Sequence, residues 1–250
     1  MTLDVQTINE IFPNDKFTVE IIGEPSNTVT IRSKHAPSNI CLLLKINRED
    51  IIVSSLAKCD SIENEGTGRQ LMLKVELLAK KIGGIGYIRI YDDSKIHVCG
   101  NEIDLFYLKI IMKGISWYNS LGYESDNYQY EINHNNLIIN SPISVIATQL
   151  KFDIGLFDSI SHEETVQQYV SRLFNSIQQQ HCRQIDKEYG NYVKTIIDKI
   201  SNLLVYERQL VKIISKSAGR RKRQTRHRDK HKNKKTNKKR IRKINSIRNI

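Results

Sequence analysis

The stretch from Ile51 to Ile90 limits the possible folds most, because its apolar pattern changes from strand to helix and back. Its first part, Ile51 to Ala57, is largely apolar, as expected of a strand covered on both faces. From Arg69 apolar residues recur with helical spacing until Gly83-Gly84, where a helix is expected to end. A β-rich run follows at Tyr87 to Tyr91. This order predicts a βαβ unit, in which a right-handed crossover joins two parallel strands.

The residues before this unit predict further strands. Phe17, Val19 and Ile21 alternate with polar residues, and turn residues at Gly23 to Ser26 lead into a second alternating run, which predicts a hairpin. The apolar run Ile40 to Ile46 is expected to pair with Ile51 to Ala57. Residues 1–16, with a short amphipathic turn that ends at Pro13, are expected to be a lid or a frayed lead-in.

After Ile90 the pattern predicts a helix over roughly Ile103 to Leu121. Two closing strands are expected at Tyr128 to Ile132 and Leu137 to Asn140, around a turn at His134-Asn135. The spacing Ser161-x-x-Glu164 is typical of a capping box at a helix start. Apolar stripes over 166–177 and 193–204 predict two long helices beyond it.

The expected fold class is α+β. It combines a mixed, mainly antiparallel sheet and flanking helices in residues 17–145, a helical extension in 146–217 and a disordered basic tail in 218–250.

The net charge of +12 is concentrated at one end of the 250-residue chain. Residues 219–250 hold 16 of the 39 Lys and Arg residues and one of the 27 acidic residues, a net charge of +15. Residues 1–218 carry 23 basic and 26 acidic residues, a net charge of −3. The tail has no aliphatic residue between Gly219 and Ile241, so we expect it to be disordered on its own.

The four cysteines, Cys41, Cys59, Cys99 and Cys182, are far apart in the sequence. No close pair indicates a zinc site or a redox dithiol, so buried or unreactive thiols are expected. No signal peptide is recognised, and no apolar run approaches the roughly 20 residues of a membrane-spanning helix. These features predict an intracellular protein with reduced thiols.

The segment Gly66-Thr67-Gly68-Arg69 lies between the predicted strand and the predicted helix. Glycines there allow unusual backbone conformations, and the first amides of a helix have no partner within it. A phosphate is therefore a suitable ligand, with Arg69 adding positive charge. No Gly-Lys-Ser/Thr follows and no third glycine completes Gly-x-Gly-x-x-Gly, which disfavours both common nucleotide-binding loops. The alternative is a pair of glycines that only forms a turn.

Together with the sequence Trp117-Tyr118-Asn119-Ser120-Leu121-Gly122-Tyr123, this loop resembles the GNAT family of acyl-CoA-dependent N-acetyltransferases. The resemblance covers roughly residues 40–140. It implies that Gly66, Thr67, Gly68 and Arg69 hold the coenzyme A pyrophosphate and that Ile51 to Ala57 binds the pantetheine arm. It also implies that Tyr118 is the general acid that protonates the departing thiolate. Without the loop, Trp117 and Tyr118 would be a core aromatic pair.

The chain departs from the family pattern at several positions. Glu63 stands where the family loop begins with Arg or Gln, and Glu65 adds a second carboxylate, which would repel a pyrophosphate. Ile111 stands where the family has an asparagine. The nearby carboxylates Glu49, Asp50, Glu63 and Glu65 do not identify a general base.

The tail gives an independent prediction of sequence-blind, salt-dependent binding to DNA or RNA. The basic residues expected to contact phosphates are Arg220, Arg221, Lys222, Arg223, Arg226, Arg228, Lys234, Lys235, Lys238, Lys239 and Arg240. A nuclear localisation signal centred on residues 220–223 and a contact to an acidic partner or membrane are alternatives. In composition, a chain rich in Ile, Asn and Lys with such a tail resembles proteins of large DNA viruses.

The leading expectation is acetyl transfer from acetyl-CoA to an unidentified amine, without a metal, by an enzyme tethered to nucleic acid by its tail. The nucleus, a viral factory or a virion is the expected location of such an enzyme. The alternative is a non-catalytic nucleic-acid-binding or virion protein on a degenerate GNAT fold.

Overall fold

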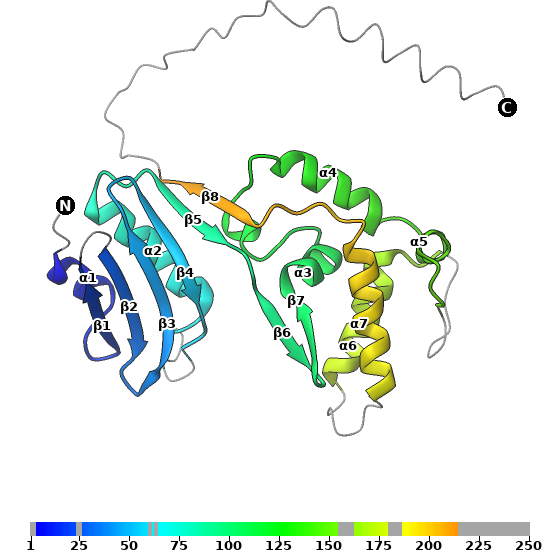
Figure 1. The fold of residues 1–250 in the computed structure, drawn as a ribbon, viewed down its shortest axis with the longest axis horizontal. Helices are drawn as coiled ribbons and strands as arrows, with labels where there is room; N and C mark the ends of the chain where they lie inside the picture. The colour runs from blue at the N-terminus through cyan, green and yellow to red at the C-terminus, as the bar shows by residue number, and fades with distance from the viewer. Residues whose placement is uncertain are drawn as a thin grey trace, which may run out of the picture. The chain divides into compact units, whose positions relative to one another are not determined.

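The computed structural model describes residues 4–23, 27–59, 62, 65–154, 163–179 and 187–214. These ranges contain seven α-helices and a mixed six-stranded sheet of order β1-β2-β3-β4-β5-β8 (Figure 1). All neighbouring strands are antiparallel except β4 and β5, which are parallel. The predicted α+β class and mainly antiparallel sheet are confirmed. The bounds of the sheet strands are β1 Phe17–Ile22, β2 Asn27–Ser33, β3 Ala36–Ile46, β4 Asp50–Leu56, β5 Tyr87–Tyr91 and β8 Gln209–Ile213.

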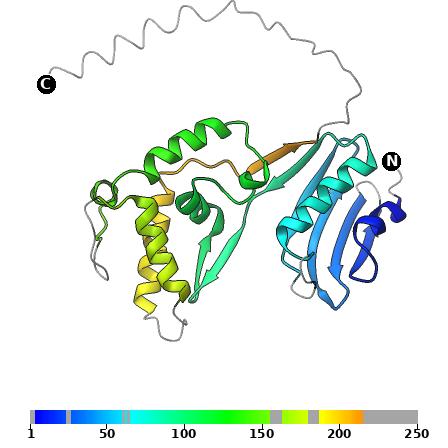
Figure 2. The same ribbon diagram turned by 180° about the vertical axis from the view of Figure 1, so that it is seen from behind.

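The predicted βαβ unit is confirmed. Helix α2 (Gly68–Ile82) connects β4 to β5 and buries Leu71, Val75 and Leu78 against the sheet. It ends at Gly83, whose φ of 70° is a conformation that residues with a Cβ rarely adopt. Figure 2 shows α2 across one face of the sheet.

The expected lid or frayed lead-in is instead part of the core. Helix α1 (Val5–Ile11) is capped by Asp4, whose side chain accepts a hydrogen bond from the Gln6 amide. Ile8, Ile11 and Phe12 are buried in the same apolar cluster as α2. The sequence prediction failed here because seven helical residues are stable only through such packing.

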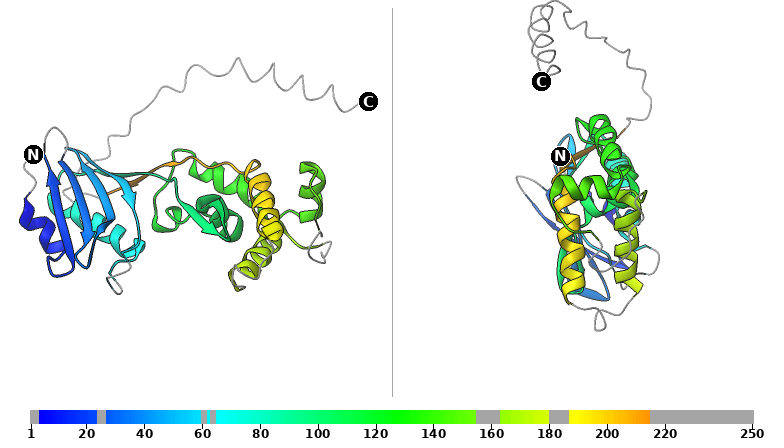
Figure 3. Two further views of the ribbon diagram at one scale, coloured as in Figure 1. Left: turned by 60° about the horizontal axis from the view of Figure 1, so that its bottom comes forward. Right: turned by 90° about the vertical axis from the view of Figure 1, so that its right-hand side faces the viewer.

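A second apolar cluster is built by residues beyond β5. It packs the hairpin β6 (Lys95–Val98) and β7 (Asn101–Asp104) with the helices of the later chain (Figure 3). The helix bounds are α3 Leu105–Lys113, α4 Tyr128–Ile139, α5 Ile143–Leu150, α6 Val166–Gln179 and α7 Lys187–Ser201. The two long helices predicted from the apolar stripes are therefore present as α6 and α7.

The two predicted closing strands and the turn at His134-Asn135 are wrong, because residues 128–139 form the single helix α4. Its inward face carries Glu131, Asn135 and Ile139, which are four residues apart. Asn135 donates to the Val205 carbonyl at 2.8 Å and accepts from the Val205 amide at 2.9 Å. Because two of the buried residues are polar, apolar residues do not recur with helical spacing in this segment. The sequence pattern therefore did not indicate a helix.

The predicted helix over Ile103 to Leu121 is also wrong in its extent. Residues 101–104 belong to β7, and α3 ends at Gly114 in the left-handed conformation. A short 3-10 helix, η1 (Asn119–Leu121), follows separately. Gly114 divides the segment because its φ of 81° cannot continue a helix.

The predicted extension over residues 146–217 is not entirely helical. Strand β8 returns to the sheet and pairs with β5, and the described residues belong to one compact unit. Helix α6 starts after a capping pair four residues later than expected. The Thr165 amide donates to Gln168 Oε1 at 3.0 Å, and the Gln168 amide donates to Thr165 Oγ1 at 3.2 Å. Ser161 lies outside the described residues.

The expectation of unpaired thiols is wrong for at least one pair. Cys41 on β3 and Cys59 after β4 form a disulfide with a Cα–Cα distance of 5.4 Å. They are 18 residues apart in sequence, and only the pairing of β3 with β4 brings them together. Among the described residues there is no free cysteine.

The predicted polybasic tail and all its phosphate-contacting residues lie outside the described residues. Within the described ranges, no helix combines the length and apolar composition that crossing a bilayer requires.

Candidate active site

The parallel strands β4 and β5 separate at their carboxyl ends. Their register runs from Asp50↔Tyr87 to Val53↔Ile90, and β4 continues to Leu56 with no further partner on β5 among the described residues. Ser54 is an extra residue opposite β3, where the register shifts between Leu43 and Leu44. Ligands of open α/β sheets bind in the crevice at the carboxyl ends of such strands. This end of β4 is therefore the candidate site.

The amino end of α2 lies at this end of β4, because a Cβ on Gly68 would be 3.8 Å from Leu56. Thr67 caps the helix by accepting a hydrogen bond from the Gln70 amide at 3.3 Å. The Thr67, Gly68 and Arg69 amides find no acceptor among the described residues, whereas the Gly66 amide donates to the Ile62 carbonyl at 3.2 Å. Three consecutive free amides at a helix start favour an anion. The glycine segment precedes the helix as predicted, but the Gly66 amide is already hydrogen-bonded and is not a free donor.

Both glycines of the loop are closely packed, and at Gly66 the packing leaves no room for a side chain. A Cβ on Gly66 would lie 2.2 Å from the Cys59 carbonyl oxygen. A Cβ on Gly68 would lie 3.2 Å from the Trp117 ring and 3.8 Å from Leu56. Gly68 thus allows the aromatic turn, the end of β4 and the start of α2 to meet.

The predicted repulsion from Glu65 is offset by two lysines. Glu65 forms ion pairs with Lys16 and, at 3.2 Å, with Lys74. The hydrogen bond from Lys16, followed by that from Lys74, lowers the Glu65 pKa from its usual value of 4.5. Glu65 therefore connects the loop to the N-terminal region through its ion pair with Lys16. Glu63 lies outside the described residues.

The Glu65 ion pairs should make a small, pH-dependent contribution to stability. Because the folded-state pKa is lowered, this contribution is complete above pH 4.5 and is lost as the pH falls through the folded-state value. Glu65→Gln should lower the melting temperature by roughly 1–3 °C at pH 7. In melts from pH 3 to 7, the difference from wild type should shrink below pH 4.5. A constant difference would contradict this assignment.

Trp117 and Tyr118 lie on the turn before η1. Their ring centroids are 4.8 Å apart, and Tyr118 is 8% exposed. The Tyr118 hydroxyl has no hydrogen-bond partner among the described residues, and its oxygen is not fully buried. Burial, and then the negative charge of Asp92, raise the Tyr118 pKa well above its ordinary value of 10. Tyr118 is therefore a protonated donor that has no hydrogen-bond partner among the described residues and lies against Trp117.

Sequence reasoning missed a buried polar network behind Tyr118. Asp92, directly after β5, is 1% exposed and accepts hydrogen bonds from the Ser94 amide at 3.1 Å and the Ser94 hydroxyl at 2.6 Å. The Tyr206 hydroxyl donates to Asp92 Oδ2 at 2.7 Å and lies 3.1 Å from Ser116 Oγ. Tyr206 also packs against both apolar clusters. The network therefore fixes the turn that carries Tyr118 at the junction of the two clusters.

Removing the Tyr206 hydroxyl should destabilise the protein. Tyr206→Phe keeps the stacking on Phe106, whose centroid is 5.1 Å away, but leaves Asp92 Oδ2 without its donor. We expect a loss of about 1–3 kcal/mol in the free energy of unfolding, measured by urea denaturation. Tyr91→Phe is the control, since Tyr91 is 57% exposed. Equal stability of the two variants would show that the hydroxyl has no such role.

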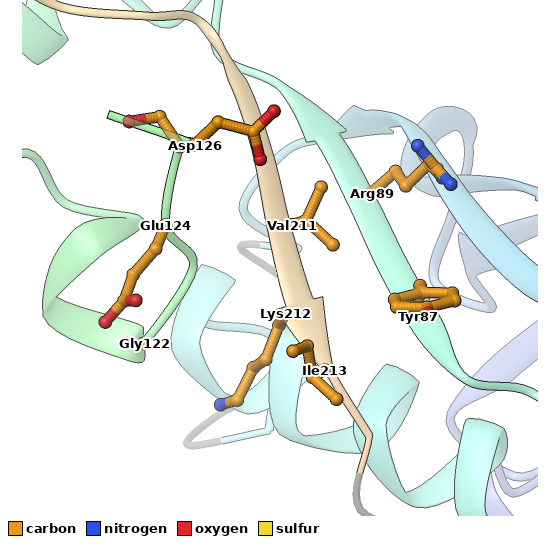
Figure 4. A pocket seen from close by; sticks show the side chains of 9 residues that line it. Tyr87, Arg89, Gly122, Glu124, Asp126, Val211, Lys212 and Ile213 are labelled. Atoms are coloured by element: carbon orange, nitrogen blue, oxygen red, sulfur yellow. The ribbon is translucent and has the colours of Figure 1, made fainter. Parts of the chain in front are cut away.

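A separate pocket of about 550 Å³ lies beside β5 and β8 (Figure 4). Its two cationic residues are already paired: Arg89 with Asp50 at 2.8 Å and Lys212 with Glu76 at 2.7 Å. In Figure 4 the Lys212 side chain extends away from Tyr87 and Arg89. None of the residues predicted from the sequence as site residues lines this pocket.

The structure therefore brings together Gly68, Trp117 and the end of β4, with Tyr118 next to Trp117 and with Thr67 and Arg69 exposed at the helix start. Asp50 lies at the opposite, amino end of β4, and Ile111 is buried in the second cluster. The carboxylate that belongs to the site is Asp92, which no motif indicated. Within the described residues, no three His, Cys, Asp or Glu side chains gather into a possible metal site.

Comparisons of this chain with protein-family models, with curated proteins and with solved structures found no match.

Proposed function

We propose that this protein transfers an acyl group from an acyl-coenzyme A thioester to an amine. The observation that carries the proposal is the meeting of three features at the carboxyl end of β4. These are the free amides at the start of α2, the part of β4 beyond its pairing with β5, and the aromatic turn with the unpaired Tyr118 hydroxyl.

The strand connections add support. In the GNAT family, which this chain resembles in its loop and its Trp117–Tyr123 segment, a central strand leads through the phosphate loop and helix to the next strand. Here β4, α2 and β5 have this order. Two closing strands follow in the family. In this chain one strand, β8, pairs antiparallel with β5, and Glu124 forms only an isolated β-bridge to Val211 of β8.

Each part of the coenzyme has a suitable partner in this arrangement. The pyrophosphate would accept from the Thr67, Gly68 and Arg69 amides, and the exposed Arg69 side chain adds positive charge. The pantetheine arm would lie along residues 54–56 of β4, which have no partner on β5 in the described chain. Trp117 would lie close to the bound phosphates because it contacts Gly68.

In the proposed reaction the amine nitrogen attacks the thioester carbonyl, the carbon–sulfur bond breaks, and the amine loses a proton to solvent. A thiol has a pKa near 8.5, so complete proton transfer from a tyrosine with a raised pKa would be unfavourable. Tyr118 therefore acts mainly by donating a hydrogen bond to the developing thiolate. This stabilisation is stronger in the transition state, where the charge forms.

Trp117, the only tryptophan of the chain, provides a direct test of binding. Acetyl-CoA titrated into the full chain should change the Trp117 fluorescence in a saturable way and raise the melting temperature. In Trp117→Phe, which serves as the optical control, the fluorescence change should be absent. No change in either measurement at millimolar acetyl-CoA would overturn the proposal.

Binding of nucleic acid by residues 219–250 is a second candidate function. The observation in its favour is the net charge of +15, with no aromatic residue in that range. Deletion after Ser217 should remove most of the salt-sensitive retention on DNA. Retention that survives the deletion would mean that residues 1–217 bind DNA.

A further inference from the structure

The Cys41–Cys59 disulfide adjoins the free amides of the candidate site through a short series of contacts. Cys59 follows β4, and its amide donates to the Gly66 carbonyl at 2.9 Å. The Ile62 amide in turn donates to the Cys59 carbonyl at 3.1 Å. Gly66 packs so closely on Cys59 that no side chain fits between them. The position of Gly66, and of the amides that follow it, therefore depends on where Cys59 is held.

The disulfide to Cys41 holds Cys59 to β3. Two residues earlier, the Ala57 amide donates a hydrogen bond of 2.8 Å to the Cys41 carbonyl. The disulfide is the covalent one, and it acts at Cys59 itself. Without it, the contacts between Cys59, Ile62 and Gly66 would be attached to the sheet only through the neighbouring chain.

We propose that the Cys41–Cys59 disulfide is a redox switch for coenzyme binding, because it holds the Cys59–Gly66 contact that positions the α2 amides. The inference rests on the proposed function. In the oxidised protein the amides of Thr67, Gly68 and Arg69 are preorganised for the pyrophosphate. In the reduced protein, these amides are no longer held in place, and coenzyme binding must first order them. The conformational entropy lost in this step lowers the affinity for the coenzyme.

The switching reaction is thiol–disulfide exchange with a dithiol reductant. A thiolate of the reductant attacks one sulfur of the disulfide, and the other cysteine leaves as a thiolate that takes up a proton. The second thiol of the reductant then releases the bound cysteine. Two electrons and two protons pass to the protein, which gains two thiols, while the reductant becomes a disulfide.

The disulfide is buried, and its stability is linked to binding of the coenzyme. Cys41 is 1% exposed and Cys59 is 2% exposed, so a reductant reaches the sulfurs only after local opening. If the disulfide favours coenzyme binding, the bound coenzyme must equally favour the disulfide. Acetyl-CoA should therefore shift the thiol–disulfide equilibrium of the wild-type protein towards the disulfide.

The test compares the full chain in its oxidised form, after dithiothreitol, and after reoxidation with oxidised glutathione. Acetyl-CoA binding followed by Trp117 fluorescence should weaken about tenfold or more on reduction and recover on reoxidation. Cys41→Ala/Cys59→Ala should bind as weakly as the reduced wild type without any reductant. An unchanged dissociation constant after complete reduction would overturn the proposal.

Cys99→Ala is the matched control, because Cys99 is also disulfide-bonded but lies at the turn between β6 and β7. This variant should bind acetyl-CoA normally and still respond to dithiothreitol. Loss of the response would place the switch at Cys99 and overturn the proposal. If the double variant does not fold, reversible reduction of the wild type decides the question.

Hydrogen exchange separates failure of this inference from failure of the proposed function. The Cys59 and Gly66 amides are hydrogen-bonded in the oxidised protein and should lose protection on reduction, whether or not acetyl-CoA binds. If oxidised protein binds no acetyl-CoA, the proposed function is wrong. Protection that survives reduction would show that the disulfide does not position the loop.

Discussion

Gly66→Ala is expected to destabilise the fold by about 1–3 kcal/mol and to abolish acetyl-CoA binding. The added Cβ would lie 2.2 Å from the Cys59 carbonyl oxygen and 2.7 Å from the Cys59 Cβ. Backbone atoms cannot yield as the end of a flexible side chain can, and the disulfide restrains Cys59 further. The loop must therefore move and take the Thr67 to Arg69 amides with it. Urea denaturation and acetyl-CoA titration measure the two effects.

Gly23→Ala is the matched control for this substitution. A Cβ at Gly23 has no atom within 4 Å, and its φ lies outside the left-handed region. We expect a stability change below about 0.5 kcal/mol and unchanged binding. If Gly66→Ala were as well tolerated as Gly23→Ala, the close contact between Gly66 and Cys59 could not define the loop.

Tyr118→Phe is expected to lower kcat for acyl transfer by about 10²-fold while the affinity for acetyl-CoA stays within a few-fold. The hydroxyl makes no hydrogen bond among the described residues, so its removal leaves no buried group without a partner. Its effect should fall on the step in which negative charge develops on sulfur. Steady-state kinetics and Trp117 fluorescence separate catalysis from binding. Wild-type kcat in this variant would remove Tyr118 from the mechanism.

The pH dependence provides a further check on Tyr118. A tyrosine with an ordinary pKa of 10 would lose its proton, and its ability to donate, as the pH approaches that value. Burial and the charge of Asp92 raise the Tyr118 pKa, so the hydroxyl stays protonated. The rate should therefore show no decrease assignable to Tyr118 up to pH 10. Tyr87→Phe, at an exposed position on β5, should leave both kcat and the pH profile unchanged.

The sequence predicted best the elements whose pattern follows directly from burial. The two faces of α2 differ in polarity, and glycines bound it on both sides, so its position and the parallel pairing of β4 and β5 could be inferred. The strands β1 to β3 alternate or are apolar for the same reason. The local sequence indicates these elements because most of their residues either face the core and are apolar or face outward and are polar.

Buried polar residues gave α4 a sequence pattern that does not indicate a helix. Glu131 and Asn135 lie on the inward face of α4 because they bond to the backbone of residues 205–207, about 70 positions later. Burial raises the Glu131 pKa, but the Ser125 hydroxyl donates to the carboxylate at 2.7 Å. Neither partner is visible in the sequence around residue 131, so the local pattern predicts two strands and a turn where the structure has α4.

The βαβ unit and the start of its helix after the glycine loop could be inferred from the sequence alone, because neighbouring residues specify these features. Three contacts could be seen only in the folded chain: Trp117 covers Gly68, Asp92 and Tyr206 lie behind Tyr118, and Cys41 pairs with Cys59. The residues in each of these contacts lie between 18 and 114 positions apart. Local pattern does not report such distances, since they are set by how the strands pair and how the two apolar clusters pack.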